Sequence, residues 1–359
     1  MKKNFLYRGI LLLKDWRNKL LFGSFNAIQP VYRMIFPSDV AYLYCAHPVL
    51  TPFVIMLKLK LNITVHILHP GADFSSYRKV IIPNGMWPTV RAATERIPRE
   101  KRVYCEVGFF PQNRNVYFDD KGVHGQSSVR EIVLNKLRPA EKDSLDQFKV
   151  YYRAKNFIKV RWDTVHSNET PTNGINYEQK KPFVFVPLQM ESDTAFDLCP
   201  FDSNQEVINA IERELPGRHI IFKVHPWDKE STYSVGSSST LLSFENTDLR
   251  QLLIHADIVV TCNSTVMLEA LLFGKKCASL GTGFSTNHHV SLECESDIGK
   301  LGDIDNWEAD QDVVDSFLFC LLEKQIGIDF WKSEKETRKL IHWLSHYDII
   351  SKPHYRHAR

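Results

Sequence analysis

Short apolar runs alternate with helical segments between residues 183 and 280, and this order constrains the fold more than any other feature. The runs are rich in β-branched and aromatic residues, as expected of strands. The expected strands are Phe183–Leu188, His219–Val224, Leu241–Phe244, Ile258–Cys262 and Lys276–Leu280, and the expected helices are Asn204–Leu215, Asp248–His255 and Thr265–Phe273. Ser203 is a candidate N-cap, and Gly217 and Gly274 follow helix ends. This order predicts a parallel, doubly wound sheet.

The first half of the chain shows a similar alternation. The expected strands are Val40–Cys45, Ile63–Leu68, Lys79–Ile82 and Arg102–Glu106, and the expected helices are Ser127–Leu137 and Ala140–Ile158. Residues 164–182 are polar and lack periodicity, which is typical of a linker. Because 359 residues suffice for two full cores, we expect an α/β protein with two domains.

The expected domain division follows from these segments. We assign residues 1–165 to an N-terminal α/β domain, 166–182 to a linker, 183–310 to the second Rossmann-like domain, and 311–359 to C-terminal helices with a basic tail. The formal net charge of only +3 argues against a nucleic-acid binder. The seven cysteines are scattered without C-x-x-C spacing, which favours buried free thiols over a zinc site or a disulfide framework.

Basic residues are concentrated at the N-terminus, where residues 1–40 hold seven lysines and arginines against two aspartates. Residues 4–22 mix apolar and basic side chains at helical spacing. This segment is either a helix packed on its domain or a basic amphipathic helix on an anionic membrane surface. The sequence shows no signal peptide and no membrane-spanning run of about 20 apolar residues. We therefore expect a cytoplasmic protein, with peripheral contact at the inner face of the membrane if the helix lies on lipid.

Cationic side chains follow the expected strand His219–Val224. Lys223 and His225 lie two residues apart, so they share one face of the strand end. A histidine there donates to a phosphate oxygen or, equally well on the sequence alone, holds a turn before Pro226. The carboxyl ends of parallel strands line the ligand crevice in folds of this class. We therefore assign both residues to a candidate phosphate site.

Asn263, Ser264 and Thr265 stand at the next strand-to-helix junction. Free backbone N–H groups at a helix start bind phosphate, and the same residues also serve as plain N-caps. Glu269 lies about one turn into the helix among apolar neighbours, so we expect a specific partner such as a ribose hydroxyl.

Carboxylates follow strands in both halves of the chain. Asp193 forms a polar cluster with Gln189 and Glu191 after the strand Phe183–Leu188, and Glu106 ends a strand of the first half. Two carboxylates that flank one scissile bond are the general arrangement of glycosyl chemistry. Spacing alone leaves open whether Asp193 and Glu106 meet, and Asp193 is equally well a loop acid that caps a nearby group.

Together these motifs resemble those of the bacterial β-Kdo transferases of capsule and O-antigen assembly. The matching segments are Pro-Leu-Gln…Asp-Thr (187–194), Lys-Val-His-Pro (223–226), Asn-Ser-Thr…Glu-Ala-Leu (263–271), Glu-Val-Gly-Phe-Phe-Pro (106–111) and the following Asp-Asp-Lys-Gly (119–122). The resemblance implies an α/β fold of two Rossmann-like domains (GT-B-like) facing a central cleft. It also implies transfer of the sugar acid Kdo from CMP-Kdo to a saccharide or glycolipid acceptor with retention, giving a β-linkage.

The same resemblance implies a role for each candidate residue. Asp193 is the expected nucleophile, Glu106 the acid/base, and His225 a ligand of the CMP phosphate. Lys223, Asn263, Ser264, Thr265 and Glu269 complete the expected nucleotide site, and Gln189 and Arg114 are expected to contact substrate.

The chemistry of the donor needs no metal and no cofactor, because CMP is a monophosphate leaving group that cationic side chains can stabilise. Glycine-rich dinucleotide and Walker motifs are absent from the sequence, as is a D-x-D motif at a strand end. Two other functions stay open. One is a CMP-sialic acid or CDP-glycerol transferase on the same scaffold, and the other is a non-catalytic subunit of a glycan-assembly complex.

Overall fold

The expected doubly wound sheet is present in the second half of the chain. The computed structural model describes residues 38–45, 47–84, 88–154, 182–193, 195–226, 228, 232–243 and 249–350. The second sheet has the order β11-β10-β9-β6-β7-β8, with every neighbouring pair parallel. Its strands are β6 (Val184–Pro187), β7 (Ile220–Lys223), β8 (Ser239–Leu242), β9 (Ile258–Thr261), β10 (Lys276–Ser279) and β11 (Leu292–Glu293).

This order is that of a Rossmann fold, with the chain reversing direction across the sheet between β6 and β9. Helices α5 (Asn204–Glu214), α6 (Leu249–His255) and α7 (Val266–Leu272) connect the strands. Ser203 is the N-cap of α5, since its hydroxyl accepts a hydrogen bond from the N–H of Glu206 at 3.3 Å. Gly217 and Gly274 have φ of 74° and 68° just beyond helix ends, a backbone conformation that glycine adopts without strain. The prediction that these glycines follow helix ends is therefore confirmed. We call this sheet and these helices the second lobe.

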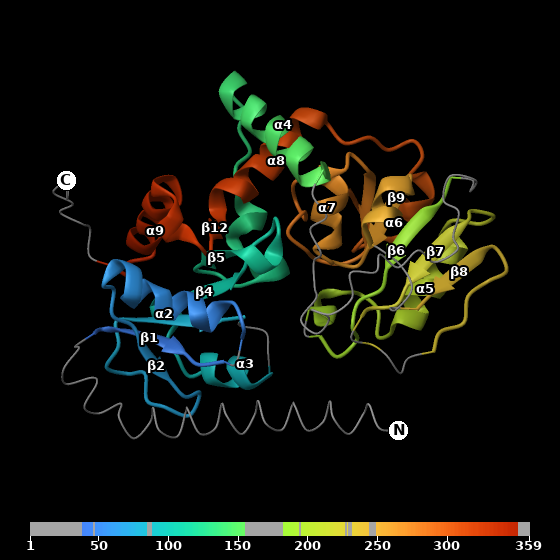
Figure 1. The fold of residues 1–359 in the computed structure, drawn as a ribbon. Helices are drawn as coiled ribbons and strands as arrows, with labels where there is room; N and C mark the ends of the chain where they lie inside the picture. The colour runs from blue at the N-terminus through green and yellow to red at the C-terminus, as the bar shows by residue number, and fades with distance from the viewer. Residues whose placement is uncertain are drawn as a thin grey trace, which may run out of the picture.

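The first lobe is built on a second six-stranded sheet, of order β12-β5-β4-β3-β1-β2. Its strands are β1 (Val40–Leu43), β2 (His66–Leu68), β3 (Lys79–Pro83), β4 (Arg102–Val107), β5 (Asn115–Asp119) and β12 (Ile326–Gly327). The four strands β1 to β4 are parallel, as the sequence predicts, whereas β5 and β12 run antiparallel to their neighbours. Helices α2 (Leu50–Leu61) and α3 (Pro88–Thr94) belong to this lobe. Figure 1 shows the two lobes side by side.

One expected helix of the first half is wrong. Residues 127–137 form only the 3-10 turn Ser128–Glu131, followed by irregular chain up to Pro139. The hydroxyls of Ser127 and Ser128 donate to a buried carboxylate at the end of β5, which ties down the start of this segment. The following helix is present as α4 (Pro139–Ala154), and the last four residues of its expected range lie outside the described residues.

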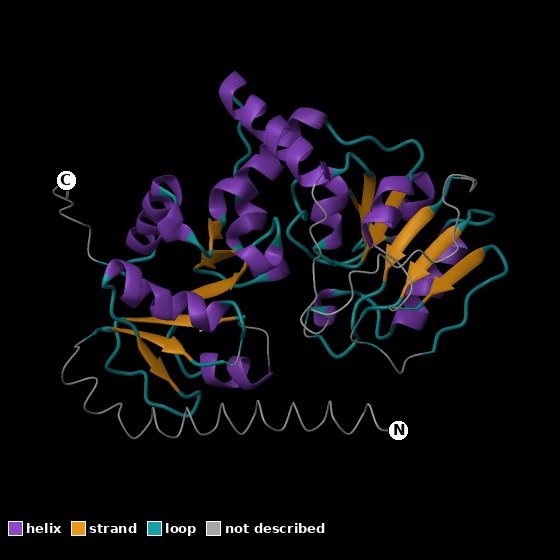
Figure 2. Ribbon diagram, viewed as in Figure 1, coloured by secondary structure: helices purple, strands orange, loops and turns teal. Residues whose placement is uncertain are grey.

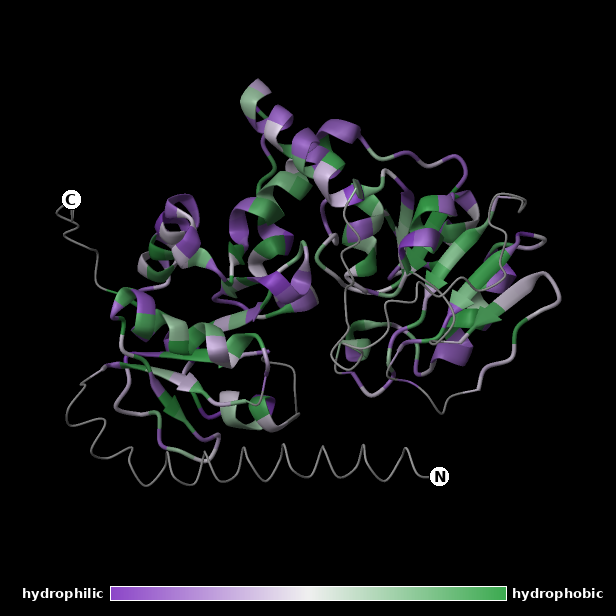
Figure 3. Ribbon diagram, viewed as in Figure 1, coloured by the Kyte–Doolittle hydropathy of each residue, from purple (hydrophilic) through white to green (hydrophobic). Residues whose placement is uncertain are grey.

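The C-terminal segment connects the two lobes a second time. Helix α8 (Gln311–Lys324) packs against α4 and α7, then β12 pairs with β5, and helix α9 (Glu334–His346) covers the same end of the first sheet (Figure 2). A buried ion pair of 2.6 Å between Lys149 and Asp315 joins α4 to α8. The sheets of both lobes are strongly apolar, as Figure 3 shows, and one hydrophobic cluster includes residues of both lobes and of α8.

Several expected features lie outside the described residues, among them the helix 4–22, most of the linker 166–182 and the basic tail 352–359. Within the described ranges, no helix has the length and apolar character that a membrane span requires. All seven cysteines are free, as predicted, and five of them are buried.

Candidate active site

Glu106 stands at the carboxyl end of β4 with its side chain inside the protein. The residue is 3% exposed. Its Oε1 accepts a hydrogen bond of 2.7 Å from the N–H of Val107, while Oε2 is buried without a partner among the described residues. A buried carboxylate oxygen with no donor is costly when charged, so the arrangement favours the protonated form.

The pKa of Glu106 follows from this environment. Burial raises it from 4.5 to about 8; the Val107 N–H opposes the rise, and the negative charge of Asp193 adds to it. A carboxyl with a pKa of about 8 is roughly nine-tenths protonated at pH 7. Glu106 is therefore a carboxylic acid at neutral pH, which is the state that a general acid needs.

Asp193 lies in the loop that follows β6, at the strand end beside the switch point of the second sheet. It is half-buried, and its Oδ1 accepts a hydrogen bond of 3.0 Å from the N–H of Ala195. Its charge acts on Glu106, which comes from the other lobe. The sequence left open whether these two carboxylates meet, and the structure places them within electrostatic reach of each other.

Hydrogen bonds tie the loop after β6 to the junction between β9 and α7. The side chain of Gln189 accepts from the N–H of Asn263 at 3.4 Å, and the amide of Asn263 donates to the carbonyl of Ala195 at 2.7 Å. The junction in turn contacts the first lobe, because Gln112 donates to the hydroxyl of Thr265 at 3.1 Å. These contacts bring both lobes together at the carboxyl ends of β4, β6 and β9.

Lys223 ends β7, the strand next to β6, and its backbone carbonyl accepts a hydrogen bond of 2.9 Å from Leu188 N–H. The side chain is buried, and burial lowers its pKa to about 8. No ion pair joins its ammonium to the described part of the chain. His225 follows two residues later and is half-buried. A buried cation without a protein carboxylate is suited to an anionic ligand.

The remaining candidates have more local surroundings. Ser264 is half-buried, and its hydroxyl accepts from Val266 N–H at 3.3 Å, as an N-cap does. Glu269 is buried on α7 and interacts with the hydroxyl of Tyr152 on α4, so it has a protein partner already. Arg114 is exposed in the 3-10 turn after β4, and within the described ranges its guanidinium makes no hydrogen bond or ion pair with the other candidates.

Gln325 is a residue of this site that the sequence did not indicate. It caps the end of α8, and its side-chain oxygen accepts from the N–H groups of Phe109 and Phe110, both at 2.8 Å. Its amide donates to the Phe110 carbonyl at 2.9 Å. Gln325 therefore fixes the loop that directly follows Glu106. Its partners lie more than 200 positions away in sequence, so no local pattern reveals the contact.

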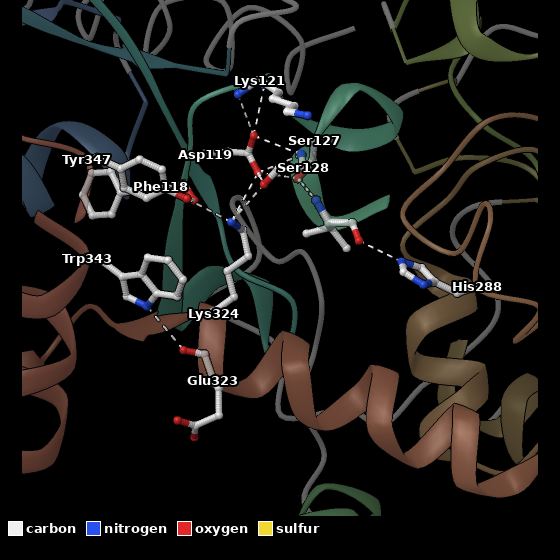
Figure 4. A network of polar contacts seen from close by, with 12 residues as sticks. Phe118, Asp119, Lys121, Ser127, Ser128, His288, Glu323, Lys324, Trp343 and Tyr347 are labelled. Carbon is white, nitrogen blue, oxygen red and sulfur yellow. Dashed lines mark hydrogen bonds and ion pairs between the residues drawn. The ribbon is translucent and has the colours of Figure 1, made fainter. Parts of the chain in front are cut away.

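A network of buried charged and polar side chains lies at the end of β5 in the first lobe (Figure 4). Asp119 is fully buried and lies 3.3 Å from the ammonium of Lys324, which also contacts the hydroxyl of Tyr347 at 3.1 Å. Burial alone raises the pKa of Asp119, but Lys324 and the hydroxyls of Ser127 and Ser128 outweigh it and lower the pKa below 3.8. Asp119 also accepts hydrogen bonds from the N–H groups of Lys121 and Gly122 in the turn that follows β5, and its ion pair with Lys324 joins β5 to α8.

The same region touches the second lobe. His288, from the loop before β11, hydrogen-bonds through Nε2 to the carbonyl of Val129 at 2.7 Å, and Figure 4 marks this bond with a dashed line at the His288 ring. Phe284 packs edge-on against Phe109 and Tyr117, with ring centroids 5.2 Å and 6.0 Å apart. The lobes are therefore in direct contact beside the candidate carboxylates.

Comparison with known proteins gives a match of part of the chain to one family model, one curated relative and solved structures of the same fold. Residues 141–291 match the family model "Capsule polysaccharide biosynthesis protein", a range that includes Asp193, His225 and Asn263 but not Glu106. Protein FixF of Sinorhizobium fredii is 27% identical over 231 residues, which cover 62% of this chain. The chain spans about half of FixF, since the match covers 52% of that protein.

Two solved structures share the fold. They are the β-Kdo 2,4 transferase and the β-Kdo 2,7 transferase of Thermosulfurimonas dismutans KpsC, with TM-scores of 0.56 and 0.53. Each is 16% identical to this chain and matches over 78% of it and 89% of the solved chain. The expected resemblance is thus confirmed: the chain has the two-lobed α/β fold of these transferases and carries the capsule polysaccharide biosynthesis sequence pattern over residues 141–291.

Proposed function

We propose that the protein is a glycosyltransferase that moves Kdo from CMP-Kdo to a saccharide acceptor with retention, in the assembly of a surface polysaccharide such as capsule or O-antigen. One observation carries the proposal. A buried, protonated carboxyl on one lobe, Glu106, lies in the field of the carboxylate Asp193 on the other. The fold shared with the KpsC transferases and the matched capsule family support the choice of sugar.

In the first step, the carboxylate of Asp193 attacks the anomeric carbon of Kdo. The bond from this carbon to the phosphate oxygen breaks, its electron pair leaves with CMP, and Glu106 gives its proton to the departing oxygen. Lys223 and His225 offset the negative charge that develops on the phosphate. Helix α7 has only seven residues, so the hydroxyls of its N-terminal flank contribute more than its dipole does.

In the second step, the charges at the site favour the reverse proton transfer. Once Asp193 is esterified it is neutral, so its part of the rise in the pKa of Glu106 disappears. Glu106, now a carboxylate, takes the proton of the acceptor hydroxyl, whose oxygen attacks the anomeric carbon and releases Asp193. Two inversions at one carbon give net retention, and both carboxyls return to their starting states.

The test is a transfer assay with purified protein on a panel of CMP-Kdo, CMP-sialic acid and CDP-glycerol. We expect turnover with CMP-Kdo, no transfer by Asp193→Asn with CMP binding retained, and a Kdo adduct on Asp193 in Glu106→Gln, detected as a mass increase. Asp197→Asn is the matched control, because Asp197 is an exposed acid on the turn that follows the same loop. Full activity of Asp193→Asn contradicts the mechanism.

The panel also separates the other functions. Turnover with CMP-sialic acid or CDP-glycerol alone rejects the choice of donor but keeps the scaffold. Absence of CMP binding by calorimetry, together with no effect of substituting Glu106, Asp193 and His225, identifies a non-catalytic subunit. Because the leaving group is a monophosphate, the proposed reaction runs without a metal, and a chelator such as EDTA is expected to leave the rate unchanged.

We also propose that the protein works in the cytoplasm at the inner face of the membrane, where residues 1–22 contact anionic lipid. The support is the basic and apolar composition of this segment. Deleting it is expected to move the protein from the membrane fraction to the soluble fraction of a lysate. An unchanged distribution assigns the segment to packing on its own domain.

A further inference from the structure

Two of the seven free cysteines stand on the two loops that build the candidate donor site. Cys199 follows the 3-10 turn Phe196–Leu198, which continues the loop carrying Asp193. Cys262 follows β9 and directly precedes Asn263. Cys199 is half-buried, whereas Cys262 is buried. The chemistry proposed above uses neither thiol.

Backbone contacts hold these two loops side by side. The carbonyl of Leu198 accepts from Thr282 N–H at 3.0 Å, and the carbonyl of Cys262 accepts from Gly281 N–H at 2.9 Å. A Cβ built on Gly281 would lie 2.8 Å from the Leu198 carbonyl oxygen, 3.0 Å from Cys199 Cα and 3.4 Å from the Cys262 carbonyl oxygen, and the first of these contacts is too short for any residue but glycine. One residue, Gly281, is therefore in close contact with both cysteines.

The two side chains also act on each other. The neighbouring Cys199 side chain and burial together raise the pKa of Cys262 well above its usual value of 9.0. Other buried thiols of the chain bond to oxygen instead: Cys277 to the Lys275 carbonyl at 3.3 Å, and Cys294 to the Leu292 carbonyl at 3.8 Å. Because Cys199 is the more exposed of the pair, a reagent from solvent reaches it first.

We propose that Cys199 and Cys262 are a redox modification site, at which a small-molecule disulfide converts the two thiols into an intramolecular disulfide across the donor site. The Cys199 thiolate attacks one sulfur of oxidised glutathione, which releases one glutathione thiolate and leaves a mixed disulfide. The Cys262 sulfur, after losing its proton to solvent, attacks the Cys199 sulfur and releases the second glutathione. Two protein thiols are oxidised and one glutathione disulfide is reduced to two thiols.

The disulfide joins the loop of Asp193 to the junction that carries Asn263 and Ser264. The two loops are connected now by hydrogen bonds, including the 2.7 Å bond from Asn263 to Ala195, and the covalent link removes their freedom to move apart. If the proposed transfer reaction is correct, Asp193 must approach the donor carbon from this loop. A small displacement of a reacting group is enough to lower the rate strongly, so we expect a loss of about tenfold or more in transfer.

The experiment treats the folded full-length protein with oxidised glutathione and maps disulfides by mass spectrometry after digestion without reductant. We expect the peptide of Cys199 linked to that of Cys262, and its loss on treatment with dithiothreitol. Cys199→Ser and Cys262→Ala abolish the link, whereas Cys320→Ser, at a half-buried thiol on α8, leaves it intact. This readout does not depend on any enzymatic activity.

Transfer is then measured on the same samples. A reversible loss of rate in the native protein, absent in Cys199→Ser, supports the effect on turnover. Free thiols at both positions after oxidation, or a stable glutathione adduct on Cys199 without the link, overturn the modification site. A mapped disulfide in a protein that fails the whole donor panel leaves the site standing and rejects the proposed transferase instead.

Discussion

Replacing Glu106 by glutamine is expected to remove a pH-dependent loss of stability from the protein. The pKa of Glu106 is about 8 in the folded chain against an ordinary value of 4.5. Because the folded pKa is raised, the stabilising contribution is fully present below pH 4.5 and is lost as the pH rises toward 8. The difference, 8 − 4.5 = 3.5 pH units at about 1.4 kcal/mol each, corresponds to about 5 kcal/mol in total. Between pH 5 and pH 9 the linkage amounts to about 4 kcal/mol.

The assay is urea unfolding followed by tryptophan fluorescence, with native protein and Glu106→Gln compared at each pH from 5 to 9. Glutamine does not titrate, and it keeps an oxygen for the hydrogen bond from Val107. We expect the free energy of unfolding of the variant, relative to the native protein, to rise by about 4 kcal/mol over this range, with most of the change below pH 8. Other titrating groups cancel in the difference.

Glu100→Gln is the matched control, because Glu100 is an exposed glutamate of the same lobe, in the turn before β4. Its series serves as the reference for the loss of a carboxylate that is not buried. A difference for Glu106→Gln that stays constant with pH, within about 1 kcal/mol, refutes the reasoning. In that case the carboxyl of Glu106 is solvated in the folded protein, and its proposed role as a protonated acid loses its basis.

Three further changes test other contacts. Asp193→Asn removes the charge that adds to the pKa of Glu106, so the pH-dependent loss of stability in the same urea series is expected to end at a lower pH. If the loss ends at the same pH as in the native protein, the charge of Asp193 does not act on Glu106. Lys324→Met leaves Asp119 buried without its cation and is expected to cost about 3–5 kcal/mol in urea unfolding, part of which the added change Asp119→Asn restores. Gln325→Leu leaves the N–H groups of Phe109 and Phe110, in the loop after Glu106, without their acceptor, while the Phe110 carbonyl keeps its hydrogen bond from Asn115. It is expected to lower kcat about tenfold or more with little change in the donor KM, since the donor groups lie on the other lobe; an equal change in KM contradicts a positioning role.

The strands and helices of the second lobe are well predicted because each is marked by residues within or next to it in the sequence. The strands there are short apolar runs, and Ser203 and Gly274 mark helix ends by their own chemistry. The positions of Asp193 and His225 at strand ends follow from the same runs. The parallel order of the sheet then places these residues on one edge, which is why the candidate site could be assembled from sequence.

The first lobe is less predictable because its contacts are distant in sequence. Helix α2 is apolar on most sides and contains Pro52, so it lacks the amphipathic period that marks a surface helix. Strand β5 ends in Asp119, which in the sequence is typical of a polar turn. Its ion-pair partner, Lys324, lies far away in the chain and is identified only by the structure. Gln325 is likewise invisible, because its hydrogen-bond partners belong to another part of the chain.

The return of the chain to its first sheet has a consequence for synthesis. Strand β12 covers the edge of β5, and α9 packs beside it, yet both elements follow the whole second lobe in sequence. When the ribosome has made the four parallel strands β1 to β4, it has not yet made β12 and α9, which complete the sheet. Until residues 326–346 emerge, β5 presents an unpaired edge that can pair with a neighbouring nascent chain. The second lobe, whose strands are contiguous, is the part able to finish folding first during translation.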